Sequence, residues 1–237
     1  MICNSGVRMT PSIDGDVHWF AEQGLFDGLF LMRDEESGTF WDHMTGEAVY
    51  GPLVGERLEV QPLFMTTAEQ ALENDSGALI TLSDRAIRSD SDMKVGGLLA
   101  GIAGRLNAFF QSTVEEEDDR RPTMDLGLGL WTDEEATYYP MDRVRNEGRA
   151  VVDTFDGKNV LVYIDPKTFV LSAFIVDGDD PEWDGDVLRL SDGSRVEDGV
   201  LYDAAGAKVE GARPLQVFTR WYGFSLTFPE TEIWGER

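Results

Sequence analysis

A motif that occurs twice constrains the fold of this chain more than any other feature of its sequence. Residues 37–51 read SGTFWDHMTGEAVYG, and a weaker copy returns at residues 198–211 as DGVLYDAAGAKVEG. The alignment pairs Gly46 with Gly206, Val49 with Val209 and Gly51 with Gly211, and one gap upstream also pairs Trp41 with Tyr202 and Asp42 with Asp203. A repeat of this kind indicates two related structural units rather than one.

Short extended runs separated by turn residues make up most of the chain, which is typical of an antiparallel β protein. The clearest example is a hairpin over residues 151–164, in which Asp156-Gly157 supplies the turn. Residues 24–32 are apolar enough to predict one buried strand. Two short helices are expected as well, at 66–73 with Thr67 as its N-terminal cap, and at 141–146. The sequence therefore predicts a mainly β fold.

One longer helix is expected between the two copies of the motif. Within residues 93–114, apolar side chains recur at helical spacing, at Leu98, Leu99, Ile102, Leu106, Phe109 and Phe110. Such a helix would lie against the core or against a second copy of the chain, so a homo-oligomer through 93–114 is one expectation. A run of charged residues at 115–121 then reads as a solvated, acidic linker. The predicted organisation is a first β-rich repeat at 1–82, a helix and linker at 83–123, and a second β-rich repeat at 124–237.

The charge balance indicates the environment. The chain has 45 acidic and 20 basic residues, a net charge of −25, and only 4 of the basic residues are lysines. A dense carboxylate surface suits a halophilic protein, because molar salt screens the self-repulsion. The alternative is an acidic surface that meets a basic partner. Nucleic acid is not an expected partner, because binding it requires a basic surface, and the 42% hydrophobic content argues against disorder.

Folding is therefore expected to depend on salt. The thermal midpoint should be lower in 0.1 M than in 3 M KCl by at least about 5 °C, which corresponds to one or two kcal/mol for a chain of this length. The reason is that the screening length falls from about 10 Å at 0.1 M to about 3 Å at 1 M salt. Circular dichroism melts at both concentrations measure it, and equal midpoints would exclude the halophilic interpretation.

The cellular compartment is predicted from the lack of a cysteine pair, a secretory signal and a membrane-spanning segment in the sequence. Cys3 is the single cysteine, so no disulfide forms within the chain, as expected in a reducing interior. The N-terminus lacks a secretory signal pattern, and no run of 18 apolar residues could span a membrane. A cytoplasmic protein without membrane contact is expected.

Several segments together resemble the domain-of-unknown-function family 3179 of bacteria and archaea. The matching segments are Cys3–Gly6, Leu31–Asp34, Thr39–Trp41, Thr45–Ala48, Gly51–Leu53, Ala136–Met141, Val152–Asp153, Val160–Tyr163 and Phe228–Thr231. Members of that family usually carry a region like 124–162 before a cysteine motif, and often a second cysteine just upstream of the position of Cys3. The first unit therefore resembles an N-terminally shortened copy, which weakens any case for cysteine-pair chemistry. The resemblance implies a shared β-rich fold and no established activity.

Catalytic candidates are few, because the chain has only two histidines and one cysteine. Cys3, Asp42 and His43 could gather as metal ligands, with His18 as a further member, or Cys3 and His43 could act as nucleophile and base. In that case the Cys3 thiol and the His43 ring should lie close together. The alternative is structural: a small buried cysteine, an outward-pointing His18 and an aspartate that begins a turn.

Binding candidates are the aromatic side chains Trp41, Tyr50 and Trp221, which could line a ligand pocket or simply fill two small cores. The acidic loop at 177–186 offers oxygen ligands for calcium but lacks the glutamate that closes an EF-hand loop.

Two functions stay open at this stage. One is a non-catalytic domain that binds a small ligand or a protein at the aromatic-lined junction of the repeats. The other is a metal-dependent or thiol-based enzyme or redox module centred on Cys3, Asp42 and His43. The scarcity of ionisable catalytic groups favours the binding domain. The sequence indicates no particular cofactor, substrate or metal.

Overall fold

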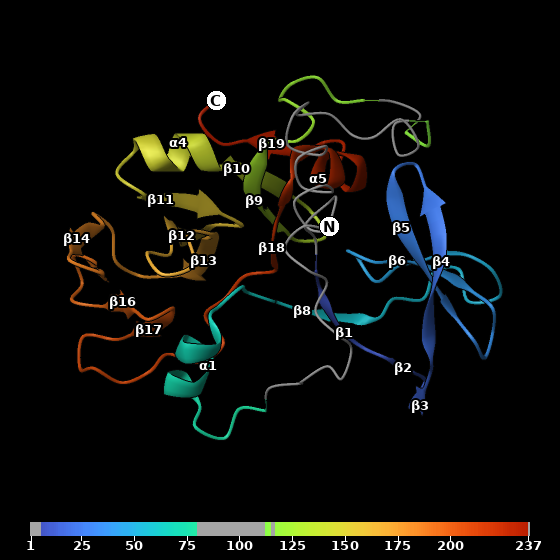
Figure 1. Ribbon diagram of the computed structural model, residues 1–237, viewed down its shortest axis with the longest axis horizontal. Helices are drawn as coiled ribbons and strands as arrows, with labels where there is room; N and C mark the ends of the chain where they lie inside the picture. The colour runs from blue at the N-terminus through green and yellow to red at the C-terminus, as the bar shows by residue number, and fades with distance from the viewer. Residues whose placement is uncertain (1–5, 80–111, 115–116, 237) are drawn as a thin grey trace, which may run out of the picture.

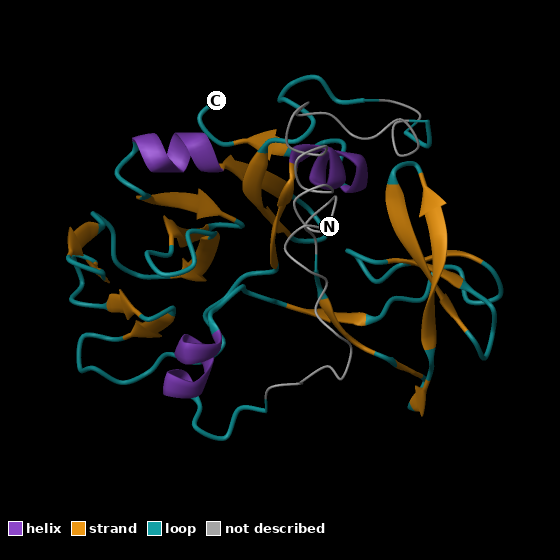
Figure 2. Ribbon diagram, in the orientation of Figure 1, coloured by secondary structure: helices purple, strands orange, loops and turns teal. Residues whose placement is uncertain are grey.

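The computed structural model describes residues 6–79, 112–114 and 117–236 (Figure 1). Strands dominate these residues, and three short helices accompany them (Figure 2). All strand pairs are antiparallel except one, β10 with β19, so the predicted mainly β fold class is confirmed. No helix in this part of the chain is both long enough and apolar enough to cross a membrane. The helix expected at 93–114 falls, up to residue 111, outside the described residues.

The N-terminal strands form one meander and two small pairs. The meander follows the chain, with β4 at Phe20–Phe26, β5 at Leu29–Asp34, β6 at Phe40–Asp42 and β7 at Ala48–Tyr50. The small pairs join β1 (Arg8–Thr10) to β8 (Glu59–Gln61) and β2 (Ser12–Ile13) to β3 (Asp16–Val17). Trp41 is fully buried in the small core of this part, together with Ile13, Ala48 and Leu58.

The single buried strand predicted over residues 24–32 is wrong. The chain reverses at Asp27-Gly28, which have φ angles of 46° and 68°, and β4 and β5 form a hairpin around them. Asp-Gly is a strong hairpin-turn pair because both positions of the turn require positive φ. The apolar residues on either side of this turn favour the prediction of one continuous strand.

A four-stranded sheet lies at the centre of the C-terminal part, in the order β18-β9-β10-β19. Its strands are β9 (Leu126–Trp131), β10 (Ala136–Pro140), β18 (Gln216–Arg220) and β19 (Glu232–Ile233). Successive side chains of a strand point to opposite faces, and neighbouring tyrosines illustrate this. Tyr139 packs in the core that includes Val162, whereas Tyr138 packs under α5 (Trp221–Thr227) against Trp221 and Phe224.

Two further sheets complete the C-terminal part. The first consists of β11 (Ala150–Phe155), β12 (Lys158–Ile164) and β13 (Leu171–Ile175), and α4 (Met141–Asn146) packs beside it. The second is a meander of β14 (Glu182–Asp184), β15 (Val187–Arg189), β16 (Arg195–Glu197) and β17 (Val200–Tyr202). The hairpin predicted around Asp156-Gly157 and the helix predicted at 141–146 are both confirmed.

The two copies of the motif show similar local geometry. In the first, the Asp42 N–H donates to the Glu47 carbonyl and Gly46 has positive φ; in the second, the Asp203 N–H donates to the Ala207 carbonyl and Gly206 has positive φ. The duplication of a whole unit and the division at 83–123 stay predictions.

Several contacts join the N-terminal part to the C-terminal part, and two of them bear on the site. The Met44 side chain, at the turn between β6 and β7, is fully buried in the core under α5 that contains Tyr138 and Trp221. Farther along, the chain from Pro62 leads into α1 (Ala68–Asn74), which lies beside β16 and β17 (Figure 1). This second contact encloses the pocket described in the next section.

Candidate functional site

Asp42 holds the turn that follows it. Its Oδ1 accepts hydrogen bonds from the Met44 N–H at 2.9 Å, the Thr45 N–H at 2.6 Å and the Thr45 hydroxyl at 3.0 Å. The carboxylate thus satisfies backbone donors that the turn leaves unpaired.

His43 is mostly buried, and its ring meets the Phe30 ring edge-on at 5.3 Å between centroids. Burial lowers the pKa of His43, although the Asp42 charge and a backbone hydrogen bond with Phe30 act in the opposite direction. The imidazole is therefore neutral at pH 7. Cys3 lies outside the described residues, so a centre formed by Cys3, Asp42 and His43 stays a prediction.

The two histidines lie at different ends of β5. His43 packs on Phe30, whereas His18 Nδ1 lies 3.4 Å from Asp34 Oδ1. Phe30 and Asp34 are four residue steps apart on an extended strand, a distance of roughly 13 Å. His18 and His43 therefore do not share a site.

The three predicted binding aromatics lie in three different settings. Trp41 is buried in the N-terminal core, and Trp221 is buried under the central sheet, where its Nε1–H donates to the Asp118 carbonyl at 2.9 Å. Tyr50 is 71% exposed and packs its ring edge-on against Phe40. The structure does not bring these side chains together.

The segment 177–186, predicted as an acidic loop, contains β14 and the turn that joins it to β15. Its Asp184 forms an ion pair with Arg189 at 3.0 Å, and Asp179 exchanges hydrogen bonds with Ser191. In the part of the chain that the structure describes, the one group of three metal-ligating side chains lies elsewhere, at His18, Asp34 and Glu36.

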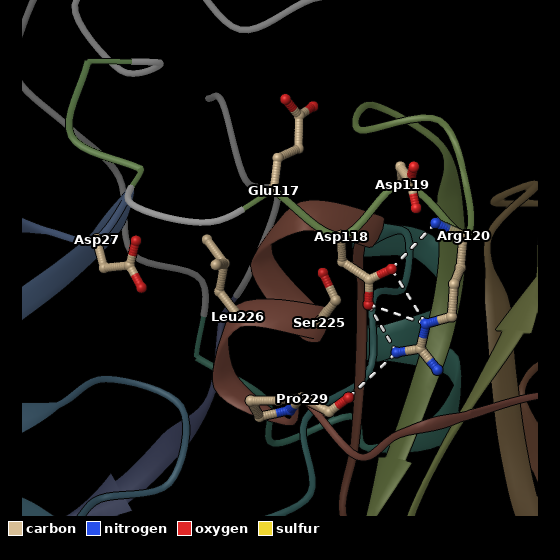
Figure 3. Close-up of a pocket in the computed structure, with 8 residues that line it drawn as sticks. All are labelled: Asp27, Glu117, Asp118, Asp119, Arg120, Ser225, Leu226 and Pro229. Carbon is tan, nitrogen blue, oxygen red and sulfur yellow. Dashed lines mark hydrogen bonds and ion pairs between the residues drawn. The ribbon is translucent and has the colours of Figure 1, made fainter.

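A cavity of about 700 Å³ lies between the β4–β5 turn, residues 117–120 and the end of α5 (Figure 3). Its lining is acidic, with Asp27, Glu117, Asp118 and Asp119. Its one lining arginine, Arg120, pairs with Asp118 at 2.6 Å and donates to the Pro229 carbonyl at 3.2 Å. A chain of net charge −25 is expected to place carboxylates over its surface, so these walls do not identify a ligand.

The junction pocket has a different chemistry. This pocket, of about 420 Å³, is lined by Pro62, Phe64, Asn74, Phe174, residues 199–201 and residues 208–213. Residues from the N-terminal part thus form one wall, and β13, β17 and the segment after β17 form the others. Most of the lining is apolar. Lys208 forms an ion pair with Glu210, another lining residue, at 3.1 Å, and Arg213 supplies a further positive charge.

Arg213 is the central feature of the junction pocket. Its guanidinium lies between two phenyl rings, 4.0 Å from the Phe64 centroid and 3.9 Å from the Phe174 centroid. It donates to the Ser172 hydroxyl at 2.6 Å, the Gly199 carbonyl at 2.6 Å and, more weakly, the Ala173 carbonyl at 3.4 Å. Burial lowers the pKa of Arg213, while Tyr163 and Asp165 raise it. Arginine nevertheless stays protonated in proteins. The pocket therefore holds a positive charge, and the groups that accept the hydrogen bonds described above are all uncharged.

Local signals in the sequence position the wall that carries Phe64. Thr67 and Gln70 form a reciprocal capping box at the start of α1, with both bonds at 3.1 Å. The Gln70 amide also donates to Asp165 Oδ2 at 3.3 Å, and the Asn74 amide donates to the Asp198 carbonyl at 3.0 Å. These bonds fix α1 against the C-terminal part and thereby hold Phe64 over Arg213.

The sequence alone does not distinguish Arg213 from the other arginines. Its neighbours, Ala212 and Pro214, form no recognisable motif, and its two aromatic partners come from distant parts of the chain. No signal short of the three-dimensional contact identifies it.

Comparison with known proteins gives one match. The profile of the family described as "Protein of unknown function (DUF3179)" matches residues 1–217, which confirms the resemblance found in the sequence. No curated protein and no solved structure matches the chain.

Proposed function

The chain belongs to the DUF3179 family, and we propose that it binds a small organic anion in the junction pocket. The observation that carries this proposal is the Arg213 guanidinium, held between two phenyl rings at an apolar cavity. The proposal makes the protein a binding protein, the function that the sequence favours over an enzyme centred on Cys3, Asp42 and His43.

The charge of Arg213 supports an anionic ligand. A cation removed from water costs free energy unless an opposite charge offsets it. The acceptors that bond Arg213 are a hydroxyl and backbone carbonyls, and Asp165 acts on it only from beyond those contacts. A carboxylate or phosphate in the pocket would supply the missing charge. The planar guanidinium suits such a group because it donates parallel N–H bonds.

The remaining walls define the rest of the ligand. Val200, Leu201 and Val209 line the pocket beside the two phenyl rings, so the ligand carries an aliphatic or aromatic group. Apolar walls with a few placed polar groups are typical of small-molecule sites.

Binding of benzoate tests this function. Benzoate should raise the thermal midpoint of the wild-type protein, whereas uncharged benzyl alcohol should not, because a ligand that binds only the folded state stabilises it. Replacement of Arg213 by lysine should weaken benzoate binding at least about tenfold in calorimetric titration, since lysine keeps the charge but loses the planar, stacked geometry.

Arg189→Lys is the matched control, because Arg189 lies on the exposed side of β15 and pairs with Asp184. Circular dichroism confirms that each variant is folded before titration. Equal benzoate affinity in wild type and Arg213→Lys would contradict the assignment, and so would no binding to the wild type at millimolar benzoate.

A further inference from the structure

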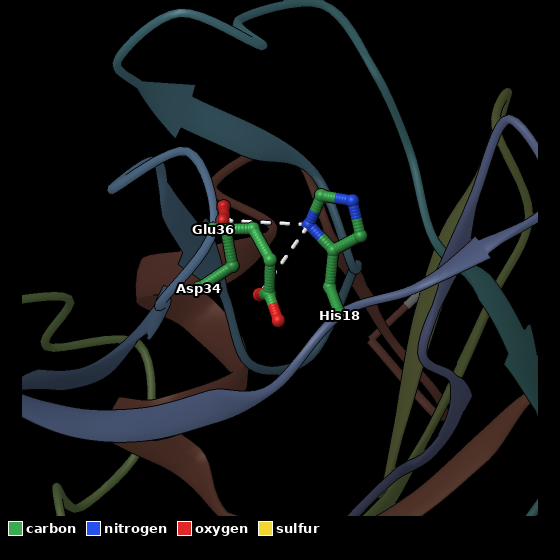
Figure 4. Close-up of side chains that lie close together, drawn as sticks. All are labelled: His18, Asp34 and Glu36. Atoms are coloured by element: carbon green, nitrogen blue, oxygen red, sulfur yellow. Dashed lines mark hydrogen bonds and ion pairs between the residues drawn. The ribbon is translucent and has the colours of Figure 1, made fainter.

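Three side chains of the N-terminal part converge at the edge of the β4–β5 sheet (Figure 4). His18 lies just before β4, Asp34 ends β5, and Glu36 lies in the turn that follows β5. His18 Nδ1 is 3.4 Å from Asp34 Oδ1 and 3.8 Å from Glu36 Oε2, and the three ligand atoms lie within 4.8 Å of one another.

These spacings are long for hydrogen-bonded ion pairs. A charge-assisted N–H···O bond is about 2.7–2.9 Å long. By contrast, ligands about 2.1 Å from one tetrahedral metal ion lie about 3.4 Å apart. The distance from His18 to Asp34 equals this value, and the partly exposed Glu36 side chain would move closer to complete the site. We propose that His18, Asp34 and Glu36 form a binding site for a divalent transition-metal ion of the zinc type.

The groups around the cluster already hold the ligands in place. Asp34 Oδ2 accepts from Trp41 Nε1 at 2.9 Å and from the Ser37 hydroxyl at 2.7 Å, while its Oδ1 accepts from the Ser37 N–H at 2.6 Å. Glu36 Oε2 accepts from the Trp19 N–H at 3.0 Å. Hydrogen bonds of this kind orient metal ligands and tune their affinity.

Exposure and ligand type define the ion. Asp34 is fully buried and the His18 side chain is 12% exposed, but the Glu36 side chain is 39% exposed, so solvent reaches the cluster from the Glu36 side. Three protein ligands with an open position are typical of exchangeable zinc sites. One imidazole and two carboxylates favour Zn²⁺, Co²⁺ or Mn²⁺ over Cu⁺, which prefers sulfur, and over Ca²⁺, which prefers oxygen alone.

The site is independent of the junction pocket, because none of its residues lines that pocket. Failure of benzoate binding would leave the metal proposal intact, and the reverse also holds.

Calorimetric titration of chelator-treated protein with ZnCl₂ tests the site. The wild type should bind one equivalent, and His18→Ala should weaken this binding at least about tenfold, as expected for loss of a ligand or its support. Glu36→Gln should weaken it as well, and this substitution is the safer one because Glu36 is partly exposed in a turn. Titration with CoCl₂ gives a second readout, since visible absorption bands of a tetrahedral site should disappear in both variants.

Two control variants separate the site from other zinc binding. His43→Ala removes the other histidine, and Glu22→Gln removes an exposed carboxylate on β4; both should bind zinc like the wild type. The proposal is overturned if the wild type binds no zinc, if Glu36→Gln binds with unchanged affinity and stoichiometry, or if His43→Ala loses the bound ion.

Discussion

Replacement of Gly129 by alanine should lower the free energy of unfolding by about 3 kcal/mol, the upper part of the range for overpacked cores. Gly129 lies in β9, paired with Tyr138 of β10 and Val217 of β18. A Cβ atom there would lie 2.0 Å from Cε2 of Phe224, on α5. The Phe224 ring is fully buried against Tyr138 and Phe228, so it cannot turn aside without moving the helix.

Urea unfolding in molar KCl measures this cost. Gly6→Ala is the matched control, because a Cβ at Gly6 would meet only the Leu63 side chain at 3.5 Å, an ordinary contact. The double variant Gly129→Ala with Phe224→Leu should lose less unfolding free energy than the two single variants lose together, because the smaller side chain at 224 relieves the overlap. Wild-type stability in Gly129→Ala would show that α5 does not pack on β9 as described.

The same glycine shows how far the sequence can predict this fold. The alternation of glycine with apolar residues at 126–131 predicts a strand, and β9 occupies that range. The residues around Gly129 do not indicate that Phe224 packs against it. The helix α5 has no side-chain cap, and its residues, which include Trp221, Tyr222 and Gly223, are poor helix formers. Packing on the central sheet, rather than local preference, makes this segment helical.

Elements with a local signal are predicted well. Thr67 caps α1, and Asp156-Gly157 turns the β11–β12 hairpin, as the sequence indicates. Each signal depends on residues within a few positions, so no distant contact is needed. The hairpin at Asp27-Gly28 carries the same kind of signal, but the apolar residues beside it favoured the wrong interpretation of one continuous strand.

The candidate sites depend on distant contacts, and sequence spacing does not reveal them. Asp42 and His43 are candidates in the sequence because the chain has few histidines and these two residues are neighbours. The structure instead brings His18 to Asp34, sixteen residues away, since β4 and β5 pair as a hairpin. Arg213 meets Phe64 only because α1 docks on the C-terminal part. The pairing of strands and the docking of α1 thus determine which side chains come into contact.

Replacement of Asp34 by asparagine should lower the free energy of unfolding by about 3 kcal/mol, because buried donors left without an acceptor cost about 1–3 kcal/mol each. Both carboxylate oxygens of Asp34 accept hydrogen bonds, including those from Trp41 Nε1 and the Ser37 N–H. Asparagine offers one oxygen, and its NH₂ group would face donors. Asp42→Asn is the control: all three of the bonds described for Asp42 reach Oδ1, so one amide oxygen can replace them and the loss should be small.

The difference between wild type and Asp34→Asn should also depend on pH. The folded protein lowers the pKa of Asp34 from 3.8 to about 2, so the ionised carboxylate stabilises the fold fully above pH 3.8 and loses this effect as the pH falls towards 2. The other carboxylates titrate in both proteins and cancel in the difference. Urea unfolding with a chelator present, at pH 5, 4 and 3, should therefore show the gap in unfolding free energy shrinking below pH 4. A gap that stays constant from pH 5 to pH 3 would mean that the neutral form of Asp34 supports the turn after β5 and the Trp41 core as well as the anion does.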